Sequence, residues 1–319
     1  MVNLSPRARA IHDASTIVVM HDHRPVAEDA PRMIVGGVTA KVYMVGVDVD
    51  IGPDFMASAA IRDGWSVRAR AEIETTLAVI SADPHLVSAN SAANIRRAKA
   101  DGKAAIVLGV EGGKLLEGHL SWVKEFYDTG LRQFQLCWAV PNQLVETDHL
   151  TDFGKTVVKE CDRLGLIVDL THFRERAFYE VMEIVERPPI VSHGAGGTDG
   201  LDDRRIEAIA AKGGMIGIHF YSSYLGPSPT VNHVVQAIQY LTARVDIRHV
   251  GFGIDFFPTK GPWRDFQHGQ GTTDVSWAIP DLSHMPLVTQ SLVENGYTDT
   301  QISGLLGGHF LDLMERVAG

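Results

Sequence analysis

The chain has few cysteines and no long apolar segment. Its 319 residues include two cysteines, Cys137 in the apolar stretch FQLCW and Cys161 in an expected helix. Two are too few for a disulfide framework, so we expect buried free thiols of the kind found in a reducing cytoplasm. The first residues lack the apolar centre of a signal peptide, and no run approaches the ~18 apolar residues of a membrane span. The sequence therefore predicts a cytoplasmic protein with no membrane partner.

Positive charge is also scarce. The formal net charge is −10 at pH 7, and basic residues form no long run. Nucleic-acid binding depends on clustered positive charge, so we expect a small-molecule partner and no nucleic acid, and we leave a homodimer open. The contents of 45% hydrophobic and 21% charged residues are those of a globular chain with a sizeable core.

Eight short apolar runs alternate with segments of helical spacing along the whole chain. The runs are rich in Val and Ile, as are strands buried on both faces of a parallel sheet. They lie at 16–20, 40–46, 105–110, 133–138, 166–171, 189–192, 214–219 and 248–254. The helical segments include 66–82, 90–101, 115–129, 154–163, 173–186, 203–212 and 230–243. This alternation predicts an α/β fold, a (β/α)8 TIM barrel, and the lack of a linker assigns residues 1–319 to one domain.

Side chains that bind metal ions lie where several of these runs end. They are His21, His23, Glu111, His172 and His193. In a barrel, residues just past the strand ends meet at one mouth. Imidazole nitrogens with one carboxylate able to bridge two cations are typical of hydrolases that use two metal ions. The sequence therefore predicts a binuclear metal site at the C-terminal mouth of the strands.

Each candidate has a structural alternative. A lone histidine is more often structural than a ligand, but positions i and i+2 of a strand point the same way, so His21 and His23 can share one cation. Glu111 could instead form an ion pair with Arg or Lys, since burying a carboxylate without a partner is costly. Asp255 ends the run GFGID, and we interpret it as a sixth ligand or a proton shuttle. The alternative for Asp255 is a carboxylate that caps the following loop.

Two connections are too long for the β/α alternation. They cover residues 47–65 and 256–278, and the second is rich in glycine and aromatic residues. Loops of this length in a compact domain are usually lids or binding loops. We expect the second to form part of the substrate wall.

Several motifs together resemble the renal (membrane) dipeptidase family, peptidase family M19 of the amidohydrolase superfamily. The resemblance covers nearly the whole chain, and the order and spacing of the motifs follow the family. They are VEGG at 110–113, LTDFGKTVVKECDRLGLIVDLTH at 150–172, PPIVSH at 188–193, AIAAKGGMIGI at 208–218, GFGIDF at 251–256 and GGHFLDLMERV at 307–317.

The resemblance implies a zinc-dependent (β/α)8 barrel with two metals bridged by Glu111. His172 and His193 would then hold the second metal, and Asp255 would handle the proton. The family's first metal is normally held by a His-x-Asp pair, where this chain has His21 and His23. A second imidazole in place of the carboxylate adds a positive charge, so we expect the first metal to be held less tightly.

Two further departures from the family concern the substrate. Trp138 stands where the family has a histidine that polarises the scissile carbonyl. Asp199 stands where the family has an arginine that grips the substrate carboxylate, while Arg204 and Arg205 fit better on the following helix. We assign Trp138, Asn142, Asp199 and Tyr221 to substrate binding, with Trp263 completing an aromatic wall. An aspartate repels a carboxylate, so we expect amidated or neutral substrates to be turned over at least as well as free acids.

Three functions remain open. The first is a dipeptidase that has changed how it holds its substrate, with attack by a hydroxide held between the metals. The second is a metal-dependent hydrolase of a non-peptide amide, cyclic amide or ester. The third is a non-catalytic binding protein or a lyase on the same barrel. Metal content separates the third from the others, and a substrate panel separates the first two.

Overall fold

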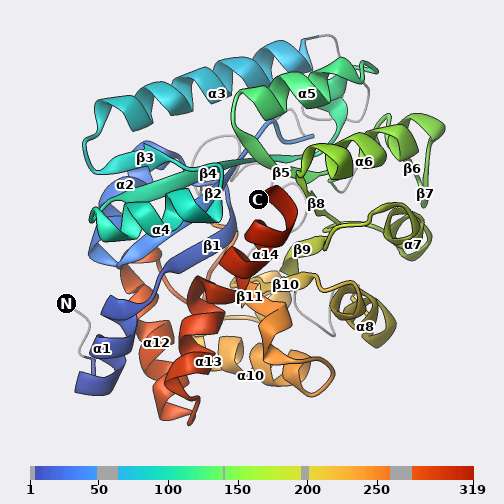
Figure 1. Cartoon of the computed structure of the whole chain (residues 1–319). Coiled ribbons are helices and arrows are strands. Elements are labelled where there is room, and N and C mark those ends of the chain that lie inside the picture. Colours follow the sequence, from blue (N-terminus) through green and yellow to red (C-terminus); the bar gives the residue numbers. More distant parts are fainter. Residues whose placement is uncertain (1–3, 49–63, 139–140, 195–200, 259–274) are drawn as a thin grey trace.

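The computed structural model describes residues 4–48, 64–138, 141–194, 201–258 and 275–319. Eight parallel strands form a barrel, with helices between them (Figure 1). In order around the sheet they are β1 (Ile17–Asp22), β2 (Val38–Val45), β4 (Ala104–Glu111), β5 (Leu131–Gln135), β8 (Ile167–Asp169), β9 (Ile190–Gly194), β10 (Met215–Ile218) and β11 (Val250–Phe252). The predicted (β/α)8 barrel is thus confirmed. β3 (Leu86–Ser88) pairs with β4 outside this path and was not predicted.

The barrel closes between its first and last strands at the C-terminal mouth. The backbone N–H of His23 donates to Phe256 O at 2.8 Å, and that of Asp255 donates to His21 O at 3.1 Å. These bonds fix the chain after β11 against the end of β1. Two segments that are more than 200 residues apart in sequence therefore meet at the mouth.

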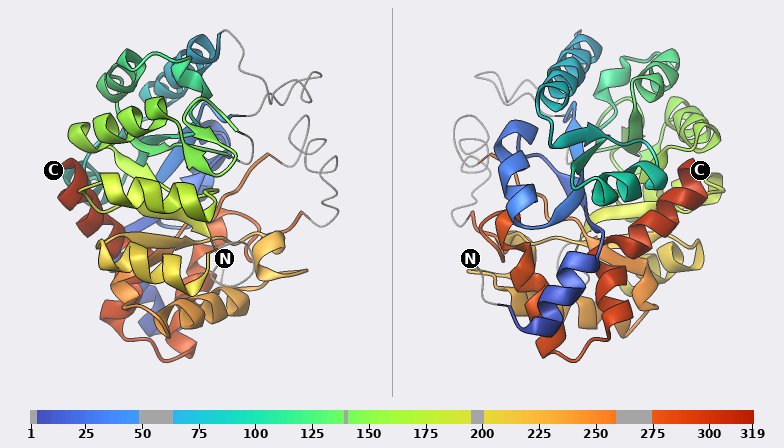
Figure 2. Two further views of the ribbon diagram at one scale, coloured as in Figure 1. Left: turned by 90° about the vertical axis from the view of Figure 1, so that its right-hand side faces the viewer. Right: turned by 60° about the vertical axis from the view of Figure 1, so that its left-hand side comes forward.

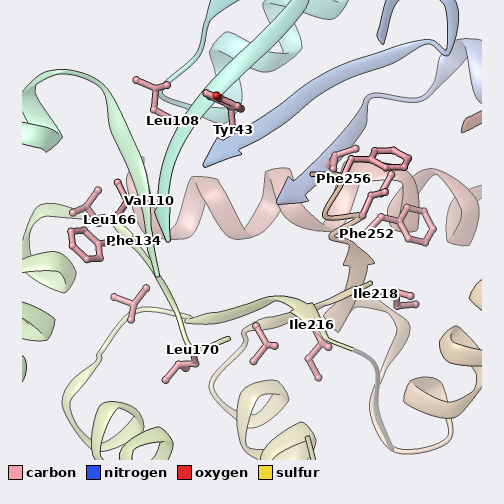
Figure 3. Packing of buried hydrophobic residues seen from close by; sticks show 14 of the residues in the cluster. Tyr43, Leu108, Val110, Phe134, Leu166, Leu170, Ile216, Ile218, Phe252 and Phe256 are labelled. Carbon is pink, nitrogen blue, oxygen red and sulfur yellow. The ribbon is translucent and has the colours of Figure 1, made fainter. Parts of the chain in front are cut away.

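Helices surround the strands and bury their apolar faces against them. They are α2 (Val26–Val35), α3 (Trp65–Ala82), α4 (Ala92–Ala100), α5 (Ser121–Asp128), α6 (Asp152–Leu164), α7 (Glu175–Ile184), α8 (Asp203–Ala211) and α10 (Val231–Thr242). Further helices are α1 (Pro6–Ala14), α9 (Ser222–Leu225), α12 (Met285–Glu294), α13 (Asp299–Ser303) and α14 (His309–Ala318). A short pair, β6 (Val145–Glu146) and β7 (His149–Leu150), precedes α6. Side chains such as Leu108, Phe134 and Ile216 form the layer between strands and helices (Figure 3).

Local sequence signals explain where helices begin and end. Thr151 caps α6 by accepting a hydrogen bond from Gly154 N–H, and Gly165 ends that helix with a φ of 77° that disfavours other residues. Asp202 caps α8 by accepting from Arg205 N–H.

The two ends of the barrel differ in polarity. Apolar residues near the strand starts, among them Val18, Ala105 and Met215, pack with Phe310 and Met314 of α14. Figure 2 shows α14 at this end of the barrel. The opposite end, where the strands finish, carries the polar side chains described below. None of the helices in the described part of the chain combines the length and the apolarity needed to cross a bilayer.

Candidate metal centre

The five side chains that the sequence predicts as metal ligands, together with Asp255, lie at the C-terminal mouth of the barrel. His21 lies in β1, Glu111 is the last residue of β4 and His193 lies in β9. His172 and Asp255 come shortly after β8 and β11, with positive φ angles of 69° and 57°. Residues other than glycine rarely adopt such angles, so tertiary contacts have to hold these two in place.

Four imidazoles gather around the Glu111 carboxylate, and their Nε2 atoms approach one another in two pairs. Nε2 of His21 is 3.0 Å from Nε2 of His23, and Nε2 of His172 is 3.2 Å from Nε2 of His193. Glu111 Oε2 lies 2.7 Å from Nε2 of His23, and Oε1 lies 3.2 Å from Nε2 of His172. The expectation that His21 and His23 point the same way is confirmed. Two nitrogen pairs that share one carboxylate match the donor set of a binuclear centre.

These nitrogen and oxygen atoms are arranged better for binding divalent cations than for hydrogen bonding to one another. Facing imidazole nitrogens repel one another through their lone pairs unless a proton or a cation lies between them. Glu111 Oε2 is buried and, despite its approach to His23, has no partner in hydrogen-bonding geometry among the described residues. Oε1 accepts from Gln135 Nε2 at 3.0 Å. Among the described residues, the ion-pair partners of Glu111 are imidazoles rather than the Lys or Arg of the alternative interpretation.

A serine orients one imidazole of each pair. Ser192 Oγ lies 3.1 Å from Nδ1 of His21 and 3.0 Å from Nδ1 of His193. It is also 3.3 Å from Thr171 Oγ1, which donates to Asp169 Oδ1 at 2.7 Å. If Ser192 donates toward Thr171, it can accept from both imidazoles. Both rings then carry their protons on Nδ1 and present unprotonated Nε2 atoms to Glu111, as metal ligation requires.

Two glycines make room for this serine. A Cβ on Gly217 of β10 or on Gly253 after β11 would lie 1.8 Å from the carbonyl oxygen of Ser192. Any side chain at either position would push the strands apart at the level of the serine. Gly217 and Gly253 therefore serve the close packing of strands at the level of Ser192.

Burial and the Glu111 carboxylate together set the charges of the centre. Burial lowers the pKa of His21 and of His193 well below the usual histidine value, so both are neutral near pH 7. Burial acts in the same direction on His23, but the adjacent Glu111 carboxylate outweighs it and raises the pKa of His23 to about 9. Burial would raise the pKa of Glu111, yet the imidazoles, His23 foremost, hold it well below its usual range. Glu111 is therefore ionised.

A buried ion network supports the turn between His21 and His23. Asp22 points away from the imidazoles, and its Oδ1 accepts from Lys41 Nζ at 2.9 Å and from Arg24 N–H at 2.9 Å. Lys41 Nζ also donates to Asp29 Oδ2 at 2.7 Å and to Arg24 O at 2.6 Å. All three protons of this fully buried ammonium are thus used, which meets the requirement for burying a charge.

His219 is a residue of this centre that the sequence analysis missed. It directly follows β10, and its Nε2 lies 2.9 Å from Asp255 Oδ2. Its position at the end of the run 214–219 is the same signal that identified His172 and His193. Ligand spacing also groups it with His193 and Asp255, and groups His21 and His23 with Asp255. Asp255 contacts imidazoles in both sets, as a ligand or proton shuttle would, and its interpretation as a cap of the following loop stays untested.

Two small cavities adjoin the centre. One of about 160 Å³ is lined by His23, Glu111, Trp138, His172, His219, Tyr221, Ser223, Tyr224, Asp255 and Phe257. The other, of about 210 Å³, is lined by Leu170, Thr171, His172, Phe173, Phe178, Val191, His193, Gly194, Leu201, Arg205 and Tyr224. His172 and Tyr224 border both cavities. The centre therefore opens to one space with several aromatic side chains and to a second space of mixed polarity that contains one arginine.

The residues expected to bind substrate have different positions. Trp138 and Tyr221 line the first cavity. Asn142 is not among the residues that line either cavity: its amide donates to Asp48 Oδ2 and Leu136 O, and accepts from two backbone N–H groups. This geometry favours a structural role for Asn142, and its contact with substrate stays an untested prediction. Asp199, Trp263 and most of the two long connections lie outside the described residues.

Arg205 is an arginine that lines one of the two cavities beside the centre. As expected, Arg204 and Arg205 both lie on α8. Arg204 is exposed, whereas the Arg205 side chain is 12% exposed and borders the second cavity. Its Nη1 donates to Phe173 O at 3.3 Å, and its Nε is 3.4 Å from Asp202 Oδ2. A cation is thus available near His172 and His193.

Comparison with protein families gives one match that spans nearly the whole chain. Residues 11–319 match the family described as membrane dipeptidase, peptidase family M19. The resemblance expected from the motifs is confirmed by this match.

Solved structures share the same fold. An amidohydrolase from Pseudomonas aeruginosa is 22% identical with a TM-score of 0.86, covering 98% of this chain and 99% of that one. The probable dipeptidase PvdM from the same organism is 20% identical with a TM-score of 0.82, and the match covers 98% of this chain and 99% of PvdM. A metallopeptidase from Rhodobacter sphaeroides, liganded with a phosphinate mimic of the dipeptide L-Ala-D-Ala, is 20% identical with a TM-score of 0.80, covering 95% and 99%. At these identities the likeness establishes the barrel.

Proposed function

The chain belongs to the membrane dipeptidase family, peptidase family M19, and from this we propose that it is a zinc-dependent dipeptidase with two metal ions at the barrel mouth. Members of this family are metal-dependent hydrolases that act on peptide bonds. The observation that carries the finer proposal is the contact of the Glu111 carboxylate with both pairs of imidazole Nε2 atoms. A set of imidazoles with a carboxylate suits zinc.

The residues divide between the two ions as follows. His21, His23 and Glu111 Oε2 would hold one ion, and His172, His193 and Glu111 Oε1 the other. When bound, the two ions would lower the pKa of a shared water molecule and polarise the scissile carbonyl.

Asp255 is the acid–base group in this proposal. Its Oδ1 lies 3.6 Å from Nε2 of His21 and 3.6 Å from Nε2 of His23, so it faces the first imidazole pair. Burial would raise the pKa of Asp255, but the hydrogen bond from His219 and the nearby imidazoles lower it to about 2. Asp255 is therefore ionised near pH 7, and in this proposal it takes a proton from the attacking water and passes it to the leaving nitrogen.

The two cavities suit a substrate of two residues. They meet at His172 and Tyr224, so a peptide bond near Glu111 would direct one residue into each space. The Rhodobacter sphaeroides metallopeptidase binds a dipeptide mimic on the same fold, which supports a dipeptide here. Arg205 in the second cavity favours a substrate with a carboxylate at that end, contrary to our expectation of a substrate without one.

A second candidate is hydrolysis of a small non-peptide amide, cyclic amide or ester. The observation that favours it is Trp138 in the first cavity, which offers one N–H and a large apolar face. A panel of dipeptides, their C-terminal amides, small cyclic amides and esters, assayed with and without added Zn²⁺, separates the two. We expect zinc-dependent cleavage of dipeptides. Turnover confined to the non-peptide substrates would replace the dipeptidase with the second candidate.

A further inference from the structure

His219 is a fifth buried imidazole at the centre, and it belongs to neither of the two pairs. It is 1% exposed and borders the first cavity together with Glu111 and Asp255. The ring of Tyr224 stacks on it, with centroids 4.1 Å apart and planes 16° from parallel. The ring of His219 is therefore held in a defined plane.

The hydrogen bonds of His219 define its tautomer. The backbone N–H of Tyr221 donates to Nδ1 of His219 at 3.0 Å. A backbone amide can only donate, so Nδ1 must be unprotonated, and a neutral imidazole then carries its proton on Nε2. The Nε2 atom lies 2.9 Å from Asp255 Oδ2, so it donates to that oxygen.

This tautomer separates His219 from the metal ligands. Its spacing to His193 and Asp255 would admit a cation, but a proton already occupies the lone-pair position of Nε2. Metal binding through Nε2 would require His219 to lose that proton while Tyr221 N–H still blocks Nδ1. His21 and His193 differ, because Ser192 can hold their protons on Nδ1 and leave Nε2 open.

The two oxygens of Asp255 consequently have separate partners. Oδ2 accepts from His219, while Oδ1 faces Nε2 of His21 and Nε2 of His23 at 3.6 Å. The backbone of Asp255 has a φ of 57°, a conformation that needs support from its surroundings. The bond from His219 provides such support at the end of the side chain.

We propose that His219 is a positioning residue that holds Asp255 by Oδ2, so that proton transfer at the metal centre uses Oδ1. The proton taken from the attacking water joins Oδ1 and leaves from the same oxygen to the departing nitrogen. Oδ2 keeps its bond to His219 throughout. This role rests on the proposed function, since it assigns a task within the same hydrolytic site.

The first test reads the tautomer directly and needs no substrate. The protein is labelled with ¹⁵N-histidine, and the His219 ring signals are assigned by their loss in His219→Gln. We expect the Nε2–H form both before and after loading with Zn²⁺. An Nδ1–H form, or direct coupling of His219 to ¹¹³Cd²⁺ bound in place of zinc, would make His219 a ligand and overturn the proposal. This result stands whichever substrate the enzyme uses.

The second test separates positioning from general structural support. His219→Leu removes the donor, His219→Gln keeps an N–H near the same place, and His249→Leu removes a buried histidine outside the centre as the matched control. We expect His219→Leu to keep the zinc content, lose kcat by about 10- to 100-fold with little change in KM, and shift the acid limb of the kcat profile to higher pH. His219→Gln should recover most of kcat.

Two results would contradict the positioning role. Loss of zinc in both His219 variants would mean that His219 is a ligand. An unchanged kcat and pH profile in His219→Leu would mean that Asp255 needs no such support. If the unmodified protein cleaves no peptide, the proposed function fails, while the tautomer and the zinc counts still decide the role of His219.

Discussion

Ser192 Oγ lies 3.0 Å from Nδ1 of His193, and the same oxygen reaches Nδ1 of His21 in the other imidazole pair at 3.1 Å. One hydroxyl therefore orients one imidazole beside each of the two proposed metal positions. Removing it leaves two buried Nδ1–H groups without this acceptor, and each ring is then free to move its proton to Nε2.

We predict that Ser192→Ala weakens zinc binding at both positions together. Loss of a partner that orients a metal ligand typically costs about 10- to 100-fold in affinity. The measurement is competition with a zinc chelator, and Ser291→Ala in α12 is a matched buried control. Normal affinity in Ser192→Ala, or loss at one position only, would show that the serine does not connect the two pairs.

We predict that Asp255→Asn keeps its zinc but slows turnover. The asparagine has nearly the same shape and can still accept from His219, but it cannot carry the proton. A positioned acid–base group typically contributes ~10²–10⁴-fold to the rate, so kcat should fall by about that factor. The measurement is kcat together with zinc content. A loss of zinc in parallel with activity would instead make Asp255 mainly a ligand.

We predict that zinc binding at the His21–His23 position releases a proton near pH 7. In the metal-free protein the Glu111 carboxylate, against the effect of burial, raises the pKa of His23 to about 9, so this imidazole is protonated at pH 7 and must become neutral to bind zinc. Below pH 9, zinc affinity at this position should rise by about tenfold per pH unit. At the other position, burial lowers the pKa of His193, so this ring is already neutral at pH 7 and releases no proton when zinc binds.

The check is calorimetric titration in buffers of different ionisation enthalpy, which counts the protons released per zinc. At least one proton per chain at pH 7 is expected, one from His23 and any further one from the shared water, and binding to this position should be the weaker at low pH. An affinity independent of pH between 6 and 9 at both positions would contradict the protonation of His23.

We predict that Arg205→Gln impairs cleavage of dipeptides with a free C-terminal carboxylate more than cleavage of their amides. A hydrogen bond between charged groups contributes about 1.5–3 kcal/mol, so kcat/KM for free acids should fall by about 10- to 100-fold. Arg204→Gln is the control, because that neighbour on α8 is exposed. The unfolding temperature of both variants is measured as well, because losing the hydrogen bond from Arg205 to Phe173 O could lower stability. Equal losses for acids and amides would restore our original expectation of a pocket without a carboxylate partner.

Much of the barrel follows from local patterns in the sequence. The eight barrel strands are short runs of Val, Ile and other apolar residues, and strands buried on both faces favour these residues irrespective of their neighbours in space. β3 was missed because three residues beside β4 carry too little pattern to distinguish them from a loop. The strand-end rule for barrels then placed His21, Glu111, His172 and His193 at one mouth before their contacts were known.

The remaining features depend on contacts between distant segments. His219 obeys the strand-end rule but was passed over, and its bond to Asp255 cannot be seen without the structure. Asn142 is assigned to substrate binding in the sequence analysis, and only the structure shows that its amide is bonded to Asp48 and neighbouring backbone. The approach of Arg205 to the second cavity depends on how α8 packs, which periodicity does not determine.

The central claim is that Glu111 bridges two zinc ions, and the most direct measurement counts zinc per chain in the unmodified protein and in Glu111→Gln. We expect two zinc ions in the former. Glutamine has the same size but cannot bridge two cations, so we expect loss of zinc and of activity with a nearly unchanged unfolding temperature. The claim would be contradicted by a protein that binds no zinc and is not activated by Zn²⁺, Mn²⁺ or Co²⁺. A Glu111→Gln variant with normal zinc content and near-normal kcat would contradict it equally.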